Sequence, residues 1–425
     1  MKKLLLILLC LPMIGFGQSW EKFYGGTNAD AGRSVQQTSD GGYIVTGYTA
    51  SFGNGDTDVY LIKTDGNGTE QWSQILGGTG WDRGRSVQQT SDGGFIIAGC
   101  TRPFNGDSDV YLIKTDGSGT EQWSKTFGGT GDDEGRSVQQ TSDGGFIIAG
   151  FTKSFGNGDY DVYLIKTDGS GTEQWSKILG GTDRDEGWSV QQTFDGGYII
   201  AGSTESFGTK AYLIKTDGSG VEQWTKTFEE NGFGFGRSVQ QTTDGGYIIT
   251  GYTSYFGNGF FDAFLLKTDN NGDSLWMKTF GGTGNDRGYS VRQTTDGGYI
   301  IVGTTEPFGL YNGNQIYLLK TNENGTEQWS QTFGEHESSC GYSVQQTTDG
   351  GYIIVSNTSD YTLLKTDGNG NEQWSRNLEI SPNYVQQTTD RGYIITGTIQ
   401  DYDSTHSDVC LIKTDAQGNV NLNQQ

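Results

Sequence analysis

The chain is poor in the residues that mark several familiar protein classes. Among its 425 residues there are four prolines, four cysteines, three methionines and two histidines. So few prolines, with no Gly-X-Y period, exclude collagen and proline-rich disorder, although the 70 glycines far exceed the usual share of about 7%. The two histidines, His336 and His406, weaken both histidine-based acid–base chemistry and zinc binding. Few of the side chains used in common catalytic and zinc sites are therefore present.

Cysteine is too sparse to build a disulfide framework. After the first 17 residues only Cys100, Cys340 and Cys410 remain, an odd number at unrelated positions of a repeat. Cys410 stands where other copies of the repeat place Tyr60 or Tyr111. We interpret these cysteines as simple substitutions and leave open whether two of them pair.

Positive charge is also scarce. Lysine and arginine total 28 against 51 aspartates and glutamates, a formal net charge of −23. A strongly acidic surface repels phosphate backbones, so we expect no nucleic-acid partner.

Only one apolar run resembles a targeting or membrane segment. Lys2 and Lys3 precede the apolar stretch 4–11, which is too short to span a bilayer, and small residues follow at Gly15 and Gly17. We predict a signal peptide at 1–17 and one domain at 18–425, secreted to the periplasm, the extracellular space or the cell surface. Lipidation at Cys10 is disfavoured by the large Leu9 before it. No later run is long enough for an integral membrane segment.

Glycine and short apolar blocks recur with a fixed period. The motif SVQQT or a close variant appears eight times, about 50 residues apart except for one interval of about 40. Its valines are Val35, Val87, Val138, Val190, Val239, Val291, Val344 and Val385. Each copy reads as four strands, in the first copy 33–38, 43–49, 59–64 and 69–76. We predict an all-β fold, an eight-bladed β-propeller of four-stranded antiparallel blades.

The strand patterns predict where each strand lies in the ring. The second and third strands are apolar on both faces, so they should be sandwiched between blades. The polar first strand suits the axis, and the fourth, with one large anchor such as Trp72, suits the rim. The chain opens with a lone fourth strand around Trp20, and no tryptophan follows Asp415. We therefore expect the N-terminal strand to complete the last blade and close a monomeric ring.

The turns explain most of the glycine. The first hairpin turn is Ser39-Asp40-Gly41-Gly42, but in the last copy Arg391 replaces the first glycine while the second persists. We predict that only the second position needs a positive φ. The turn between the third and fourth strands behaves alike, with Gly68 and its counterparts constant in all eight copies.

The repeat unit, SVQQTSDGGYIVTGYT followed by DVYLIKTDGNGTEQW, resembles the propeller repeats of secreted Bacteroidetes-type bacterial proteins, close to the delta-sixty class. The resemblance covers the chain after residue 17 and implies a secreted propeller, with little about activity. IKTDGNGTEQW is similar to the tryptophan-docking repeat of eight-bladed quinoprotein dehydrogenases, which locks blades together; no vicinal cysteine pair for a quinone is present. TSDGGYIV has the spacing of the sialidase Asp box, but its recurrence in every copy favours a turn-stabilising aspartate.

Calcium is the one metal that the sequence suggests. The pattern Asn54-x-Asp56-x-Asp58 recurs at 105–109 and 157–161, and alternating oxygen ligands suit a hard cation. The pattern lacks the glycine and distal glutamate of the familiar calcium loop, and Asx-type turns account for it equally. We therefore expect no cofactor other than structural calcium, which stays open, and we assign no metal ligand.

The connections that vary between copies predict the functional face. They join the fourth strand to the next first strand and the second strand to the third, all at one end of the ring. Just before each first strand lies a residue near the axis that can stack on a sugar or clasp a peptide. These candidate ligand-binding residues are Arg33, Arg85, Arg136, Trp188, Arg237, Tyr289 and Tyr342. The alternative is that they cap the axis and pair with loop acids such as Asp82 and Glu134.

These patterns favour a non-enzymatic binding or scaffold propeller that recognises a glycan or an extracellular protein. The alternatives are a glycan-active or redox enzyme, and a mainly structural protein of the cell envelope. No catalytic residue is assigned, because no nucleophile elbow, zinc helix or phosphate loop occurs in the sequence.

Overall fold

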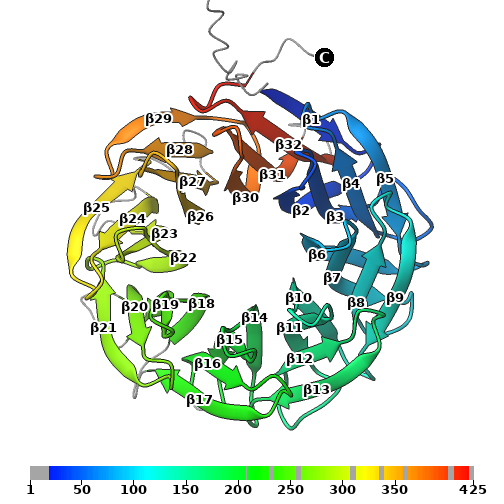
Figure 1. The fold of residues 1–425 in the computed structure, drawn as a ribbon, viewed down its shortest axis with the longest axis horizontal. Coiled ribbons are helices and arrows are strands. Elements are labelled where there is room, and N and C mark those ends of the chain that lie inside the picture. Colours follow the sequence, from blue (N-terminus) through cyan, green and yellow to red (C-terminus); the bar gives the residue numbers. More distant parts are fainter. Residues whose placement is uncertain are drawn as a thin grey trace, which may run out of the picture.

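The structure, a computed structural model, describes residues 19–206, 208–228, 234–254, 260–306, 313–334, 339–357, 362–400 and 406–420. The signal peptide expected at 1–17 and His336 lie outside the described residues. Within these ranges the chain forms eight four-stranded sheets arranged as a ring around one axis (Figure 1). No helix in this part of the chain is long and apolar enough to cross a membrane. The predicted eight-bladed, all-β propeller is confirmed.

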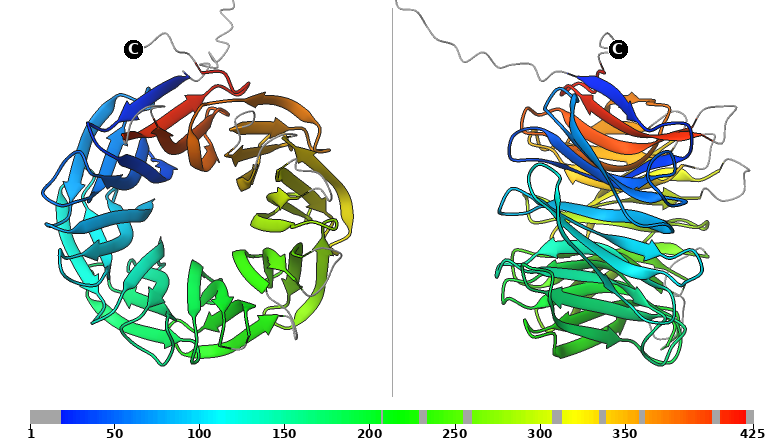
Figure 2. Two further views of the ribbon diagram at one scale, coloured as in Figure 1. Left: turned by 180° about the vertical axis from the view of Figure 1, so that it is seen from behind. Right: turned by 90° about the vertical axis from the view of Figure 1, so that its right-hand side faces the viewer.

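The sheets are numbered as blades along the chain, and in the first seven the strand order runs from the axis outward (Figures 1 and 2). Blade 1 comprises β2 (Asp30–Gln37), β3 (Tyr43–Thr49), β4 (Asp58–Thr64) and β5 (Glu70–Leu76); blade 2 comprises β6 (Trp81–Gln89), β7 (Phe95–Arg102), β8 (Asp109–Thr115) and β9 (Glu121–Phe127); blade 3 comprises β10 (Asp133–Gln140), β11 (Phe146–Thr152), β12 (Asp161–Thr167) and β13 (Glu173–Leu179); blade 4 comprises β14 (Asp185–Gln192), β15 (Tyr198–Thr204), β16 (Lys210–Thr216) and β17 (Glu222–Phe228).

The second half of the ring repeats this order. Blade 5 comprises β18 (Gly234–Gln241), β19 (Tyr247–Thr253), β20 (Asp262–Thr268) and β21 (Ser274–Phe280); blade 6 comprises β22 (Arg287–Gln293), β23 (Tyr299–Thr305), β24 (Gln315–Thr321) and β25 (Glu327–Phe333); blade 7 comprises β26 (Gly341–Gln346), β27 (Tyr352–Ser356), β28 (Leu363–Thr366) and β29 (Glu372–Arg376); blade 8 comprises β30 (Ser381–Gln387), β31 (Tyr393–Gln400), β32 (Ser407–Thr414) and, as its outer strand, β1 (Trp20–Tyr24).

The first strand of the chain closes the ring as predicted. β1 pairs antiparallel with β32, with Trp20 opposite Lys413 and Tyr24 opposite Val409. Figure 1 shows the two strands side by side, one from each end of the described chain. Because blade 8 is completed by this pairing, its third strand is not left as an open edge.

The apolar core lies between the blades. The middle strands are buried along their length, as in β4, whereas the inner and outer strands are half-buried. One cluster joins Ile44 and Leu61 of blade 1 to Phe95 and Ile97 of blade 2, and similar clusters fill the other junctions. Cys410 is fully buried in such a cluster, where an aromatic stands in most other copies, and the three cysteines of the described chain are free thiols. The cysteines are thus unpaired in the structure.

A tryptophan of each blade docks on a glycine of the next. At Gly68 a Cβ atom would lie 2.6 Å from the ring of Trp20, and the same contact recurs in every blade up to Trp374 on Gly418. Gly68 has φ of +75°, so the left-handed turn and the indole both require a residue without a side chain. The Trp20 indole N–H also donates to the Gly66 carbonyl (3.1 Å). The resemblance to a tryptophan-docking repeat therefore agrees with the geometry.

The first hairpin turn contradicts one prediction. Gly41 has φ of +83°, and Arg391 at the same place in blade 8 has φ of +69°, so the replaceable position is the left-handed one. Gly42, the constant glycine, does not adopt a left-handed conformation; a Cβ there would lie 2.1 Å from the Thr64 carbonyl oxygen and 2.6 Å from Lys63 Nζ. The second glycine is therefore required by close approach of the backbone, not by its φ.

The group that approaches Gly42 is a buried lysine repeated in every blade. Lys63 Nζ donates to Asp40 (2.9 Å), the Thr64 carbonyl (2.8 Å) and Gln71 (3.0 Å). Burial raises the pKa of Asp40, but hydrogen bonds from Thr38, Lys63 and the Gly42 amide outweigh it and lower that pKa to about 2. The aspartate of the Asp-box-like motif thus holds the turn to the third strand, in agreement with the structural interpretation of the motif.

Substitutions in this turn should distinguish the steric requirement for glycine at one position from the requirement for a left-handed φ at the other. Gly42→Ala should lower the free energy of unfolding by about 1–3 kcal/mol, because the new methyl overlaps the Thr64 carbonyl. Gly41→Asn should cost less than about 1 kcal/mol, since asparagine tolerates the left-handed region. Chemical denaturation of both variants gives the comparison. If both variants lost the same free energy of unfolding, the steric requirement at Gly42 would be contradicted.

Loss of the closing tryptophan should weaken the whole ring. Trp20 is only 2% exposed, so Trp20→Ala should cost about 3–5 kcal/mol and uncover the contact between blades 8 and 1. Trp81, which is 44% exposed and lies outside the docking series, is the matched control and should be nearly neutral. Denaturation midpoints and size-exclusion profiles measure both effects. Similar midpoints for the two variants would contradict a role for Trp20 in closure.

Candidate functional site

The candidate binding residues all occupy β-bulges on the inner strands. In β2, Gly32 faces Gly47 and Ser34 faces Thr46, so Arg33 is an extra residue without a partner across the strand pair. The same shift occurs in every blade, at Arg33, Arg85, Arg136, Trp188, Arg237, Tyr289, Tyr342 and Asn383. A bulge bends the strand and redirects the side chain of the extra residue. We call these eight residues the axial collar.

Ion pairs link the collar across neighbouring blades. Arg85 contacts Glu134 (Nε–Oε1 3.2 Å), and Arg136 contacts both Glu134 (3.5 Å) and Glu186 (3.2 Å). Arg184 binds the other oxygen of Glu186 at 2.5 Å. Glu186 has a side chain only 5% exposed, so these charges interact in a partly desolvated setting. Blades 2, 3 and 4 are thereby joined at their axial ends.

Aromatic rings carry the collar further round the axis. The Arg136 guanidinium lies 3.7 Å from the centre of the Trp188 ring, and that of Arg237 lies 4.9 Å from it. These distances are within the range of cation–π attraction. In blades 6 and 7, Tyr289 and Tyr342 form an aromatic pair with centres 6.2 Å apart. The collar thus has an arginine–tryptophan side and a tyrosine side.

Arginine is concentrated at this end of the ring. Eight of the eleven arginines of the chain belong to the collar or lie beside it: Arg33, Arg83, Arg85, Arg102, Arg136, Arg184, Arg237 and Arg287. The guanidinium groups of Arg33 and Arg83 both lie over the ring of Tyr48, 5.7 and 4.9 Å from its centre. Burial and the neighbouring Arg85 charge both lower the pKa of Arg33. Local positive charge therefore accumulates on an otherwise acidic protein.

Sequence reasoning was right about one loop acid and wrong about the other. Glu134 pairs with collar arginines, as the capping interpretation expected. Asp82 is instead fully buried, where its Oδ2 accepts a hydrogen bond from the Gly78 amide (2.7 Å). Sequence reasoning also missed Tyr48 and Tyr252, which support arginines from the second strands. The recurrence of an aromatic at the end of these strands is the signal that could have found them.

Exposed aromatic side chains surround the collar on the variable loops. Phe104 is 77% exposed and Phe260 is 79% exposed, both on connections between second and third strands. Trp81, at the start of β6, donates to Asp56 (2.6 Å) and lies over Arg83 (5.2 Å). Together with the collar they give this face both apolar and cationic contact groups.

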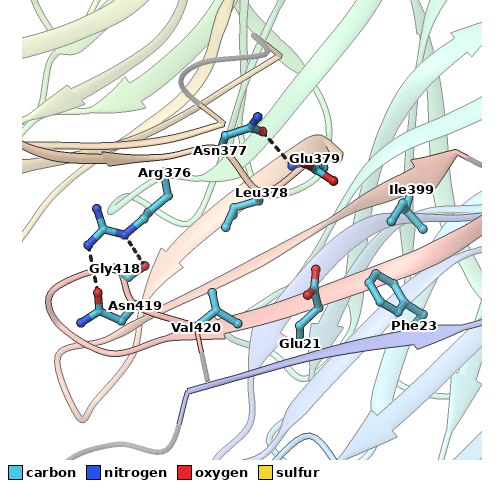
Figure 3. A pocket seen from close by; sticks show the side chains of 10 residues that line it. All are labelled: Glu21, Phe23, Arg376, Asn377, Leu378, Glu379, Ile399, Gly418, Asn419 and Val420. Carbon is cyan, nitrogen blue, oxygen red and sulfur yellow. Dashed lines mark hydrogen bonds between the residues drawn. The ribbon is translucent and has the colours of Figure 1, made fainter. Parts of the chain in front are cut away.

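A groove of about 520 Å³ lies away from the axis, where blade 8 meets blade 7 (Figure 3). Its lining residues are Glu21, Phe23, Arg376, Asn377, Leu378, Glu379, Ile399, Gly418, Asn419 and Val420. The Arg376 guanidinium donates hydrogen bonds to the Gly418 and Gln417 carbonyl oxygens (3.1 and 2.8 Å). Burial, with the nearby Glu379 charge, raises the pKa of Glu21.

A second groove, of about 530 Å³, lies beside Phe194 and Trp224. Neither groove was foreseen from the sequence, and neither contains a collar residue.

The Asn-x-Asp-x-Asp pattern does not converge on one point. Asp56 accepts the Trp81 indole N–H, and Asp159 pairs with Lys153 (3.0 Å), whereas the last aspartates of these two copies, Asp58 and Asp161, are buried. Within the described ranges no three His, Cys, Asp or Glu side chains form a metal cluster. The Gly55 and Gly158 amides donate to Asp58 and Asp161, which lie three residues further along the chain. In an Asx turn the side chain accepts from an amide that follows it, so these contacts are of a different kind.

Comparisons with known proteins extend the fold assignment. No family model matches the chain. Over 209 residues it is 29% identical to the regulatory protein FlaEY of Caulobacter vibrioides, a match that covers 42% of this chain and 22% of that protein. The chain therefore spans about a fifth of the length of this curated relative.

Solved propellers superpose over most of the ring. Sqt1 from Chaetomium thermophilum aligns with a TM-score of 0.57 at 11% identity, over 93% of this chain and 100% of that one. BamB from Moraxella catarrhalis aligns with a TM-score of 0.53 at 11% identity, over 91% of this chain and 97% of that one. At such low identity the likeness shows the propeller fold alone.

Proposed function

We propose that this chain is a non-enzymatic binding propeller that acts outside the cytoplasm as a single ring. Its ligand is an acidic glycan, bound over the arginine–tryptophan side of the axial collar. The observation that carries the proposal is Trp188, half-buried at the axis and flanked by the guanidinium groups of Arg136 and Arg237.

The charge balance of the collar favours an anionic ligand. Glu134 and Glu186 neutralise part of the positive charge, through Arg85, Arg136 and Arg184. Among the described residues Arg33, Arg83, Arg237 and Arg287 have no carboxylate partner. Guanidinium groups offer paired donors that match carboxylate and sulfate oxygens. An acidic sugar would supply the missing anions, and the protein's net charge of −23 would repel it elsewhere.

The aromatic groups supply the second half of sugar recognition. The apolar faces of sugar rings pack on flat aromatic side chains, and Trp188, Tyr289 and Tyr342 are such groups on the inner strands of blades 4, 6 and 7. Tyr342 is 40% exposed, so it is accessible to a ligand. Exposed Phe104 and Phe260 on the surrounding loops enlarge the contact area.

The collar glutamates support binding over catalysis. Glu134 and Glu186 each form ion pairs with collar arginines. Their carboxylate oxygens are therefore engaged by guanidinium groups of the protein itself. The two carboxylates are therefore best understood as supports that orient the arginines.

Binding should depend on the stacked pair. On an array of neutral, uronic-acid, sialylated and sulfated glycans, the protein should select acidic ones. Trp188→Ala and Arg136→Gln should each weaken binding at least about tenfold, close to 1.4 kcal/mol, because each removes a central contact. Surface plasmon resonance on the best glycan measures the change.

Phe194→Ala is the matched control. Phe194 is 75% exposed but lies beside the hairpin turn at Asp195, on the opposite face, so its loss should leave binding unchanged. Equal thermal midpoints would confirm that the collar variants are folded. A blank array from folded, monodisperse protein would reject sugar recognition and direct the search to an acidic protein partner by pull-down.

A further inference from the structure

Each junction between blades contains a second feature that the collar does not use. A residue near the start of the third strand of one blade forms a parallel bridge with a residue near the start of the first strand of the next, as Thr57 does with Trp81 and Phe261 with Asn285. The next residue on each side therefore lies beside its counterpart across the junction. In blades 1 and 2 these residues are Asp58 and Asp82, which are 2% and 1% exposed.

Five of the eight junctions place two aspartates at these positions. The pairs are Asp58 with Asp82, Asp109 with Asp133, Asp161 with Asp185, Asp262 with Asp286, and Asp408 with Asp30. We call them the junction pairs. At Gly77 a Cβ atom would lie 2.6 Å from Asp58 Oδ1 and 2.4 Å from Asp82 Oδ2, so the two carboxylates meet over one glycine. Gly128 and Gly180 occupy the same place in the next two junctions.

At two other junctions both acids are absent, and the corresponding residues are Lys210 with Gly234 and Gln315 with Ser339. At the junction of blades 7 and 8, Ile380 replaces the second acid, and the register of β28 gives the place of the first to Asp360, which lies outside the described residues. Two buried like charges repel each other, so pairs kept at five junctions indicate that something of opposite charge is shared between them.

The acids are not needed for the junction itself. The Asp82 amide donates to the Thr57 carbonyl at 2.7 Å, and the same bond joins Gly234 to Thr209 (2.7 Å) and Ser339 to Asn314 (2.7 Å) where no acid pair exists. The main-chain bridge therefore forms with or without carboxylates. The side chains of Asp82, Asp133, Asp185 and Asp286 each hold a loop as well, since their Oδ2 atoms accept hydrogen bonds from glycine amides. The Oδ1 atoms are the ones left for a further partner.

The pairs also carry carboxylate oxygens that lack a donor. Asp82, Asp133, Asp185 and Asp286 are at most 1% exposed, and in each the Oδ1 atom is buried with no hydrogen-bond partner in the described structure. Asp109 has such an oxygen as well, and it faces the Gly128 position together with Asp133 Oδ2. A buried carboxylate oxygen without a donor has lost its hydrogen bonds to water and has gained no protein hydrogen bond in exchange, which costs free energy.

We propose that the junction pairs are structural calcium sites, one at each of five blade junctions. Two carboxylates supply the charge, and main-chain carbonyl oxygens and water would complete the six to eight oxygen ligands that calcium takes. No third His, Cys, Asp or Glu joins a pair in the described part of the chain, so side-chain carboxylates would supply only part of the ligand set. The ion would tie the third strand of one blade to the first strand of the next, next to the collar bulge.

The ligand set differs from the Asn-x-Asp-x-Asp pattern that first suggested calcium. Only the last aspartate of that pattern belongs to a junction pair, while Asp159, in the middle of the third copy, binds Lys153. The partner acid comes from the following blade, 24 residues further along the chain in the pair Asp161 and Asp185. The two ligand sets therefore predict different effects of substitution.

Ion counting on the purified full chain tests the proposal. After exhaustive dialysis against a chelator, calorimetric titration with calcium chloride and elemental analysis should give five ions per chain, and the thermal midpoint should rise with added calcium. The double variant Asp161→Asn/Asp185→Asn should bind one ion fewer. If chelation unfolds the protein, refolding on addition of calcium supports the same conclusion.

Asp159→Asn is the control and should keep all five ions. A folded, chelated protein that gives no heat with calcium and retains no ion would overturn the proposal and leave a shared proton as the link within each pair. An unchanged ion count in the double variant would overturn it too. A parallel titration with magnesium identifies the ion, since equal or tighter magnesium binding would reject calcium. None of these outcomes depends on glycan binding.

Discussion

Packing of one indole on one glycine, repeated eight times, is the contact on which the ring depends. Each blade is a twisted sheet with two apolar faces, so no blade can be stable before both faces are covered by neighbours. The tryptophan of the outer strand reaches across that interface and occupies the space a side chain would take on the left-handed glycine of the next blade. Because Trp20 makes this contact for the last interface, the N-terminal strand belongs to blade 8 even though it starts the described chain.

Once the middle strands are buried, only the two ends of the inner strands are free to vary. At one end the lysine–aspartate network of the hairpin turn is the same in every blade. At the other end a bulge in each inner strand turns one side chain out of the ladder. The axial collar and the junction pairs both lie at this end. The scaffold therefore confines chemical variety to one face.

The fold and the place of the candidate site were predictable, while the contacts within the site were not. Repeat period, strand polarity and the position of Trp20 predicted the blades and their closure. The pairing of Arg136 with Glu186, and of Asp161 with Asp185, joins residues about 50 and 24 positions apart, and no local pattern encodes such neighbours. The hairpin glycines show the same limit. Because Arg391 replaces the first glycine in the last copy, the sequence suggested that the second glycine is constant for its φ. The actual reason is the lack of space around Gly42, which is set by Lys63 from another strand.

The sequence by itself determined that this protein is a closed ring of eight blades, because local hydrophobic patterning and turn residues repeat in every copy and allow one arrangement of layers. It also determined that the arginine- and aromatic-rich collar positions lie near the axis. The tertiary structure alone decided which of these residues touch: it set Trp188 between two guanidinium groups and brought aspartates of successive blades over a single glycine. The physical reason is that these contacts form between blades, where bulges and strand twist, not chain order, fix the distances.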